Sequence, residues 1–235
     1  MKVLGIETAT MTSSVALVEN GTLVAEHNVK VSLSHSERLI HTVNRILEDA
    51  RVDLESVDGV AISIGPGSFT GVRIGVGTAK ALSYAARKLL LPVPTLEGMA
   101  FLFQEENALL CPVLDARRGE VYSSLYRRED GMLRQILPPF CGRSDRVIEA
   151  ISSSRRDGER VVIGGPGLPL LGGFINETGL SSISSSDVSL PRALGVALRG
   201  EEILLSGQSA DPLTLVPLYV RPSDAETKLG RRIDE

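Results

Sequence analysis

A glycine-proline turn followed by a helix with a ridge of small residues constrains this chain more than any other stretch. An apolar strand is expected to end at Ile64, and the turn Gly65-Pro66-Gly67 follows it. The next helix is expected to begin near Gly71 and to continue to Lys88. A row of small residues lets another backbone approach closely, whereas an interior glycine otherwise costs about 1 kcal/mol relative to alanine. Either a ligand or a partner helix is therefore expected against this row, which consists of Gly71, Gly75, Ala79 and Ser83.

The first half of the chain predicts an antiparallel meander followed by alternating helices and strands. Asn20-Gly21 is a strong signal for a two-residue hairpin, and a hydroxyl-rich turn, residues 8–14, precedes the second strand. From Ser34, a plausible N-cap with Glu37 as its capping-box partner, apolar residues follow the 3-4 spacing of an amphipathic helix. The expected strands are 3–6, 15–18, 23–31, 57–64 and 92–94, and the expected helices are 34–50, 71–88 and 96–106.

The second half repeats this order of elements, with antiparallel strands first and alternating helices and strands after them, although no residue-level repeat is visible. A polar turn, Arg117-Arg118-Gly119-Glu120, joins two strands, and a second glycine-rich turn, residues 164–167, follows a third. The last helix is expected to hold Pro191 in its first turn. The pattern predicts two related α/β lobes, residues 1–106 and 107–235, with a frayed tail at 223–235. The expected strands are 111–116, 121–126 and 161–163, the expected helices are 144–154 and 191–206, and an apolar segment covers 213–220.

Composition narrows the classes of function. Hydrophobic residues make up 43% and charged residues 23% of the chain, as in ordinary soluble globular proteins. The net charge of −4 lacks the basic footprint of a nucleic-acid-binding domain, so RNA would dock mainly elsewhere. Cys111 and Cys141 are not in ligand spacing and are expected to be reduced. We expect a cytoplasmic protein, because the N-terminus has no secretion signal and no apolar run could cross a membrane.

The glycine turn fits neither of the common phosphate-binding motifs. No Gly-Lys-Ser/Thr follows it as in a P-loop, and position 70 is threonine where a dinucleotide fingerprint requires glycine. A packing turn is therefore favoured over a phosphate cradle, which stays open as an alternative. His35 and His41 would point to different sides of a helix, and no metal site is expected.

Several acidic residues are candidates for acid–base chemistry. Glu7 ends a buried strand beside the hydroxyl turn, where sites collect in open α/β sheets. Asp115 and Glu120 flank a turn with two arginines, and a surface ion-pair cluster explains them equally well. Glu97 is a further candidate. Serines occur on turns, but no nucleophile elbow surrounds them.

The helix 71–88 is apolar over much of its circumference, which is typical of a helix buried on more than one side. Its own sheet can cover one side. The helix from residue 34 can cover a second side, or the two helices can together face another chain. Periodicity alone leaves an internal helix and a subunit interface equally open.

Four segments together resemble the TsaB (YeaZ) family, whose members are partner subunits in bacterial threonylcarbamoyladenosine modification of tRNA. They are LGIETAT at 4–10, GPGSFTGVRIG at 65–75, LDARRGEVY at 114–122 and PLYVRPSDAE at 217–226, in the family's order. The second segment is the most specific. The resemblance is weakest from Phe140 to Leu190.

The resemblance implies an α/β protein with the two-lobed actin-like ATPase fold (ribonuclease H-like), each lobe a mixed sheet with helices, and a non-catalytic role. The related catalytic subunit, TsaD, carries a metal-binding H-x-E-G-H stretch, and this chain has Thr95-Leu96-Glu97-Gly98-Met99 there. Neither Thr95 nor Met99 is a credible ligand for a hard or borderline cation. The acidic residues that TsaD has after its first strand are replaced by Met-Thr-Ser-Ser at 11–14. We therefore expect no catalytic residues, no metal and no required cofactor, although ATP or ADP bound weakly or at an interface is compatible with the fold.

The resemblance also implies partners. TsaB-family proteins pair with TsaD through the first two helices of the N-terminal lobe, and the ATPase TsaE joins at that pairing. The complex transfers a threonylcarbamoyl group to the adenosine next to the anticodon of tRNAs that read ANN codons. This chain would form a homodimer when alone, reach tRNA only through the complex, and bind no membrane. The implied interface residues are Leu39, Val43, Ile46, Gly71, Val72, Gly75, Val76, Ala79, Leu82 and Ser83. A vestigial nucleotide cleft would hold Glu7, Thr8, Thr10, Gly65, Gly67, Asp115, Gly164 and Gly165.

Two other functions compete with this interpretation. Two glycine turns, 65–67 and 164–167, that face one another across a cleft would suit an ATP-dependent phosphotransferase or ATPase of the same superfamily. A peptidase is disfavoured by the missing metal ligands and the missing nucleophile elbow.

Overall fold

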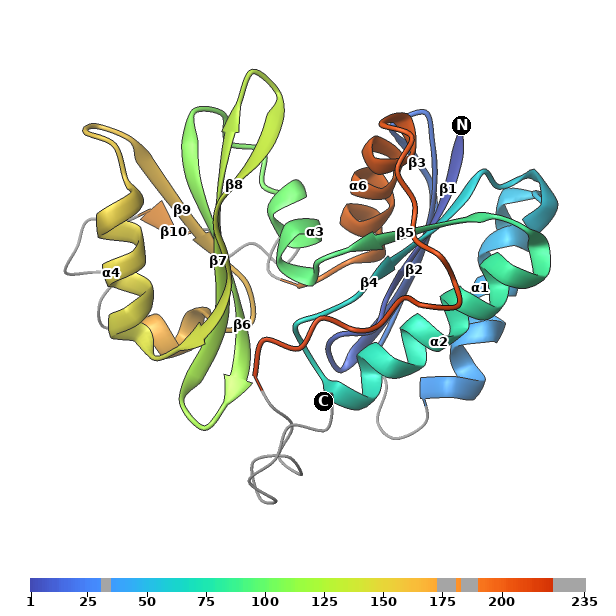
Figure 1. Ribbon diagram of the computed structural model, residues 1–235, viewed down its shortest axis with the longest axis horizontal. Coiled ribbons are helices and arrows are strands. Elements are labelled where there is room, and N and C mark those ends of the chain that lie inside the picture. The colour runs from blue at the N-terminus through green and yellow to red at the C-terminus, as the bar shows by residue number, and fades with distance from the viewer. Residues whose placement is uncertain (31–34, 173–180, 183–189, 222–235) are drawn as a thin grey trace.

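Two five-stranded sheets, each covered by helices, form the two lobes of the computed structural model (Figure 1). The structure describes residues 1–30, 35–172, 181–182 and 190–221. The strand order is β3-β2-β1-β4-β5 in the first sheet and β10-β9-β6-β7-β8 in the second. No helix of the described residues is long and apolar enough to span a bilayer.

The first sheet combines an antiparallel meander with two parallel strands. β1 pairs antiparallel with β2 and parallel with β4, and β4 pairs parallel with β5. Two-residue turns of the Asn-Gly type close such hairpins, and Asn20-Gly21 joins β2 to β3. The strands are β1 (Lys2–Glu7), β2 (Thr12–Glu19), β3 (Thr22–Lys30), β4 (Gly59–Ser63) and β5 (Leu89–Val93).

Helices cover both faces of the first sheet, and the side chains of β1 alternate between them. Leu4 and Ile6 belong to the core under α1 (His35–Ala50) and α2 (Phe69–Ala86). Val3 belongs to the core under α6 (Ala193–Leu205) on the opposite face. Because successive strand residues point to opposite faces, an apolar run without polar interruption is required for a strand buried on both sides.

The second sheet is built in the same way. α4 (Ser144–Ser154) covers one face with Val147 and Ile151. α3 (Thr95–Phe101) covers the other face with Leu96 and Met99. The strands are β6 (Ala108–Arg117), β7 (Glu120–Glu129), β8 (Met132–Gly142), β9 (Arg160–Gly164) and β10 (Ser181–Ser182), and two 3-10 turns are η1 (Leu54–Ser56) and η2 (Leu168–Leu171).

α3 and α6 lie between the two sheets and pack against each other (Figure 1). A Cβ atom on Gly195 of α6 would overlap the carbonyl oxygen of Gly98 in α3. A Cβ atom on Gly200 would lie 2.5 Å from Cβ of Ala61 in β4. Small residues thus let α6 approach both α3 and the first sheet.

The predicted helices and strands are confirmed, whereas β8 and β10 were not predicted and several ends differ. α2 begins at Phe69 and not near Gly71, because Oγ of Ser68 accepts the N–H of Gly71 at 3.3 Å and caps the helix. α3 ends at Phe101, five residues before the predicted end at 106. Nη2 of Arg128 donates to the last carbonyls of the helix, those of Ala100 and Phe101. Pro191 precedes α6 and does not lie in its first turn, because Oγ of Ser14 accepts the Ala193 N–H at 2.9 Å and fixes the helix start there. The predicted N-cap Ser34, the side chain of Glu37 and the tail 223–235 lie outside the described residues.

The predicted lobe boundary does not hold for the end of the chain. Residues 107–235 were assigned to the second lobe, but α6 packs on the first sheet. Residues 208–221, which we call the C-terminal strap, then run along the first lobe. The N–H of Ala210 donates to the Leu90 carbonyl at 2.8 Å, and the N–H of Leu218 donates to the Ile64 carbonyl at 2.8 Å. The strap returns to the second lobe only at its end.

Candidate functional site

The row of small residues on α2 packs inside the chain. A Cβ atom on Gly71 would overlap the backbone carbonyl oxygen of Thr8, and one on Gly75 would overlap Oγ1 of the same threonine. That Oγ1 donates a hydrogen bond to the Gly71 carbonyl at 2.8 Å. The glycines therefore let α2 lie directly on the end of β1, and the partner of the ridge is the chain itself.

The other residues predicted for a subunit interface are also part of the core. Leu82 is partly buried and packs against the core of the first lobe. The prediction that these residues contact a partner subunit must be corrected, because they already pack between the helices and the first sheet. The side chains that are at most 3% exposed are Leu39, Val43, Ile46, Val72, Val76, Ala79 and Ser83.

The outward side of α2 carries a second row of small residues. Gly77, Ala81 and Ala85 are exposed and follow one another at four-residue spacing. The space beside Gly77 is open. Tyr84 is 69% exposed next to this row. A partner helix can approach closely along such a row. The four-residue spacing of this second row is present in the sequence, beside the row at 71–83 from which close approach was predicted.

α1 lies beside α2 on the same face of the first sheet (Figure 1). On its outward side Ile40 is 41% exposed, and Asn44 and Glu48 are also exposed. Together these surfaces form one continuous candidate docking region. We define the outer helical face as Ile40, Asn44, Glu48, Gly77, Ala81, Tyr84 and Ala85.

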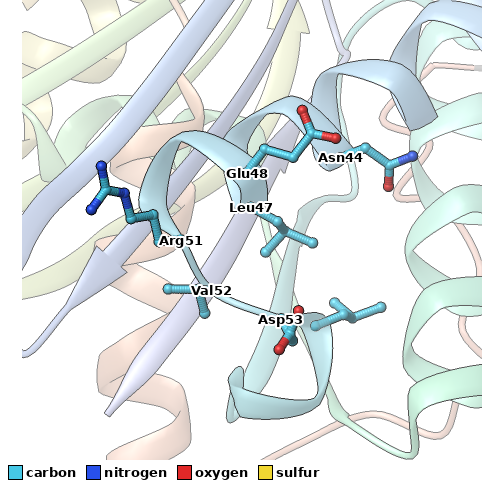
Figure 2. A pocket seen from close by; sticks show the side chains of 7 residues that line it. Asn44, Leu47, Glu48, Arg51, Val52 and Asp53 are labelled. Carbon is cyan, nitrogen blue, oxygen red and sulfur yellow. The ribbon is translucent and has the colours of Figure 1, made fainter.

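Hollows occur where the two helices end. One of about 260 Å³ lies between the end of α1 and η1, where Glu48, Arg51 and Asp53 give it a mixed charge (Figure 2). Another of about 520 Å³ lies between the end of α2 and Pro212. Both lie away from the glycine turns. They border the outer helical face and make its surface concave at the ends of the two helices.

The C-terminal strap borders the other edge of α2. Nζ of Lys80 donates to the carbonyls of Leu213 and Leu215 at 3.3 and 3.0 Å. Nε of Arg73 donates to the Tyr219 hydroxyl at 2.7 Å, and the guanidinium lies 3.8 Å from the ring centroid of Phe69. The strap was predicted only as an apolar segment, because an irregular stretch has no periodicity to show where it packs.

Glu7 lies at the end of β1 and is fully buried. Its Oε1 accepts the N–H of Ala9 at 2.5 Å, whereas Oε2 has no hydrogen-bond partner among the described residues. Burial raises the pKa of Glu7 to about 7, against the opposing effects of the Ser63 hydroxyl and of the backbone N–H groups of Ala9 and Thr8. A raised pKa suits general acid–base chemistry, but a carboxyl with no exposed surface cannot meet a substrate in this conformation.

The first glycine turn is filled by the chain itself. A Cβ atom on Gly65, which has φ +111°, would lie 2.6 Å from the carbonyl oxygen of Leu218 in the strap. A Cβ atom on Gly67 would lie 2.5 Å from Cβ of Ala9. These contacts account for both glycines as packing residues, in agreement with the favoured prediction.

The second glycine turn meets the first through α3. The N–H of Thr95 donates to the Gly65 carbonyl at 2.8 Å. A Cβ atom on Gly165 would lie 2.7 Å from Cε of Met99. Gly164 is buried at the end of β9. The two turns thus contact opposite ends of one helical turn of α3, the first through the Thr95 backbone and the second through the Met99 side chain.

The predicted nucleotide-cleft residues differ in how far they are buried. Thr8 is buried under α2, and Thr10 is part-buried, with its Oγ1 accepting the Thr12 N–H at 3.2 Å. Asp115 is exposed on the second sheet, where its Oδ1 accepts the Arg117 N–H at 2.7 Å. Packing thus encloses most of these residues, and the vestigial nucleotide cleft stays a prediction.

Thr95 and Met99 are each 1% exposed. The Thr95 hydroxyl lies 2.7 Å from Oγ of Ser63, and Met99 belongs to the core of the second lobe. Within the described ranges, three or more His, Cys, Asp or Glu side chains do not come together in a metal-binding arrangement. Glu97, another acidic candidate, pairs with Arg199 at 2.7 Å.

Comparison with solved structures identifies the class of fold. A ROK hexokinase from Thermus thermophilus, at 13% identity, superposes with a TM-score of 0.51 over 88% of this chain and 100% of that chain. The chain therefore has the two-lobed actin-like fold of ATPases and sugar kinases. YeaZ from Pseudomonas aeruginosa is much more similar, with a TM-score of 0.78 and 27% identity over 93% of this chain and 99% of that chain.

The sequence comparisons identify the family within this class. A family model described as tRNA N6-adenosine threonylcarbamoyltransferase, TsaD, matches residues 28–163. The tRNA threonylcarbamoyladenosine biosynthesis protein TsaB of Bacillus subtilis is 30% identical over 97% of this chain and 97% of the relative. The chain belongs to the TsaB (YeaZ) family, a branch of the TsaD-like proteins.

Proposed function

We propose that this chain is a non-catalytic scaffold subunit of the bacterial machinery that attaches threonylcarbamoyl groups to tRNA. The relative from Bacillus subtilis is named for the biosynthesis of threonylcarbamoyladenosine. The observation that carries the non-catalytic part is the burial of Thr95 and Met99 between the two glycine turns. The Thr95 hydroxyl is hydrogen-bonded to Ser63, and the Met99 thioether lies in the core of the second lobe. These two side chains do not provide ligands for a catalytic metal at this position.

The outer helical face is the surface that we assign to the catalytic subunit of the TsaD family. Gly77 and Ala81 let a partner helix lie close to α2, and Tyr84 supplies a large exposed aromatic anchor. Aromatic residues are enriched among those that dominate binding energy. Because α1 and α2 lie side by side, a pair of helices from the partner would complete a bundle.

The further partners follow from this arrangement. The ATPase TsaE joins where the two subunits pair, and tRNA is the substrate of the assembled complex. Alone, the chain uses the same face for a symmetric homodimer, since a two-fold interface requires only one self-complementary patch. No cofactor is required by this chain, ATP or ADP is held weakly or at an interface, and the protein works in the cytoplasm.

Ala81→Arg tests the assignment of the face. The new side chain would put a charge into the centre of the interface, and we expect binding to a TsaD-family subunit to weaken by roughly thirtyfold or more, about 2 kcal/mol. Ser152→Arg on the exposed side of α4 is the matched control and should bind as the wild type does. Equal binding by both variants, measured by isothermal titration calorimetry with circular dichroism to verify folding, would refute the assignment.

A phosphotransferase or ATPase remains the competing function. The raised pKa of Glu7 is the observation in its favour, because active sites often hold such groups. Incubation of the isolated chain with Mg-ATP decides between the two. We expect no turnover above the buffer rate, and robust hydrolysis by the isolated chain would contradict the scaffold function.

A further inference from the structure

The turn between β6 and β7 has an unusual sequence for its backbone. Arg117, Arg118 and Gly119 all have positive φ angles, 66°, 57° and 74°. The left-handed region costs about 1–2 kcal/mol for residues with a Cβ atom. Two consecutive arginines therefore occupy a strained conformation at an exposed hairpin.

Two other hairpins of the described residues show what the fold alone would require. The turns between β2 and β3 and between β7 and β8 also contain two residues, Asn20-Gly21 and Asp130-Gly131. Asn20 has φ 49° and Asp130 has φ 52°, close to the 57° of Arg118. Asn-Gly and Asp-Gly are the preferred pairs for such turns. The left-handed pair at 118–119 is thus matched twice in this chain without arginine, so packing does not explain Arg118.

More arginines lie at the same end of the second sheet. Register places Asp115, Val121 and Gly142 side by side on β6, β7 and β8. Arg143, which follows β8 directly, is exposed, as are Arg118 and Arg117, whose side chain is 76% exposed. Three neighbouring strand ends therefore present cationic side chains to solvent together.

Among the residues that the structure describes, fewer carboxylates than arginines lie at this end, and each of these carboxylates accepts a hydrogen bond within the chain. Asp115 accepts the Arg117 N–H, and its Oδ2 lies 3.9 Å from Nη1 of the same arginine. Glu120 pairs with Arg221 of the strap at 3.0 Å. Asp145 accepts the N–H of its own neighbour, Arg146, whose Nη1 donates to the Cys141 carbonyl. In a chain of net charge −4, the described residues at this end carry more arginines than carboxylates, namely Arg117, Arg118, Arg143, Arg146 and Arg221 against Asp115, Glu120 and Asp145.

We propose that Arg117, Arg118 and Arg143 form a contact surface for backbone phosphates of RNA, and that the RNA is the tRNA bound by the complex. The inference rests on the proposed function, which brings this chain to a complex that acts on tRNA. The planar guanidinium donates paired hydrogen bonds to phosphate oxygens, and phosphate contacts position a nucleic acid without reading its sequence. A surface of three arginines is an auxiliary contact, in keeping with the acidic remainder of the chain.

Salt dependence of tRNA affinity is the measurement that tests this surface. The probe is a fluorescently labelled, unmodified tRNA transcript, titrated with the reconstituted complex of this chain and a TsaD-family subunit. Each lost phosphate contact reduces the slope of log K against log salt by roughly 0.7–0.9, which at about 0.1 M salt is a roughly tenfold loss of affinity. We expect the salt slope to fall by the amount of one phosphate contact in Arg118→Asn. In the double variant, which combines Arg117→Asn with Arg118→Asn, it should fall by the amount of two.

Asparagine is the informative substitution because it suits the left-handed turn, as Asn20 does. Thermal unfolding of Arg118→Asn should therefore occur at the wild-type temperature or above it. Arg118→Lys keeps the charge and should keep most of the salt slope. Arg134→Asn is the matched control, since Arg134 is exposed on β8 opposite Arg127, near the Asp130-Gly131 turn at the other end of the sheet.

The outcomes separate this inference from the proposed function. Unchanged tRNA affinity and slope in the double variant, or an equal loss in Arg134→Asn, would overturn the RNA surface while leaving the scaffold function intact. A weaker association with the TsaD-family subunit and an unchanged affinity for tRNA would assign the arginines to an acidic protein surface and would also overturn it. Failure of the wild-type complex to assemble would instead contradict the proposed function.

Discussion

Gly75 lies so close to Thr8 that a Cβ atom at position 75 would overlap the threonine Oγ1. This oxygen is not free to withdraw, because it donates a hydrogen bond to the Gly71 carbonyl one turn earlier on the same helix. α2 and the end of β1 are thus joined through a contact that only glycine permits. The most specific sequence motif of the chain, 65–75, encodes this internal junction.

Alanine substitutions along α2 should separate its two rows of small residues. Gly71→Ala and Gly75→Ala should destabilise the protein by about 1–3 kcal/mol, because overpacking forces Thr8 or the helix to move. Gly71→Ala should be the more damaging, since it meets a backbone carbonyl. Urea denaturation of purified variants measures both effects.

Gly77→Ala is the control on the same helix. The open space beside Gly77 accepts a methyl group, and replacing an interior helical glycine should stabilise the protein by up to about 1 kcal/mol. A destabilised Gly77→Ala, or a Gly75→Ala as stable as the wild type, would contradict the internal position of the first row.

Glu7 should make stability depend on pH. Its pKa is raised from 4.5 to about 7 by burial, so the folded state holds the proton more tightly than the unfolded state does. Stability from the protonated carboxyl is fully present below pH 4.5 and is lost as pH rises to about 7, by an amount on the order of 3 kcal/mol.

Glu7→Gln provides the comparison for this effect. Glutamine keeps an oxygen for the Ala9 N–H but does not ionise, so this variant should gain stability relative to the wild type as pH rises from 5 to 8. Unfolding free energies measured at both pH values give the difference. A stability gap between the two proteins that stays constant with pH would show that Glu7 does not titrate in this range.

Breaking a buried ion pair should destabilise the second lobe. Nε of Arg127 lies 2.5 Å from Oε1 of Glu159, and the two side chains are 7% and 6% exposed. Removing the carboxylate leaves the buried Arg127 charge with the neutral Ser154 carbonyl as its hydrogen-bond acceptor, so Glu159→Gln should cost about 3–5 kcal/mol. The exposed pair of Arg45 and Asp49 is the control, and Arg45→Gln should change stability by less than about 0.5 kcal/mol. Similar losses in both variants would refute the distinction.

Sequence periodicity predicted most elements of the fold but not which surface each one contacts. The row from Gly71 to Ser83 indicated close approach correctly, yet its partner, Thr8, lies 63 residues from Gly71 and could not be found from local spacing. The placement of α6 on the first sheet is equally non-local, because its amphipathic pattern suits either lobe. The C-terminal strap follows no period at all. The outer row at Gly77, Ala81 and Ala85 was present in the sequence, but only the structure distinguishes an exposed row from a buried one.

Reconstituted tRNA modification tests the scaffold account most directly. The assay combines a TsaD-family subunit, TsaE, threonylcarbamoyl-adenylate and unmodified tRNA, with the wild-type chain, with Ala81→Arg or with no added chain. We expect full modification only with the wild-type chain, and the Ala81→Arg reaction should resemble the one without it. Equal modification in all three reactions would contradict the account.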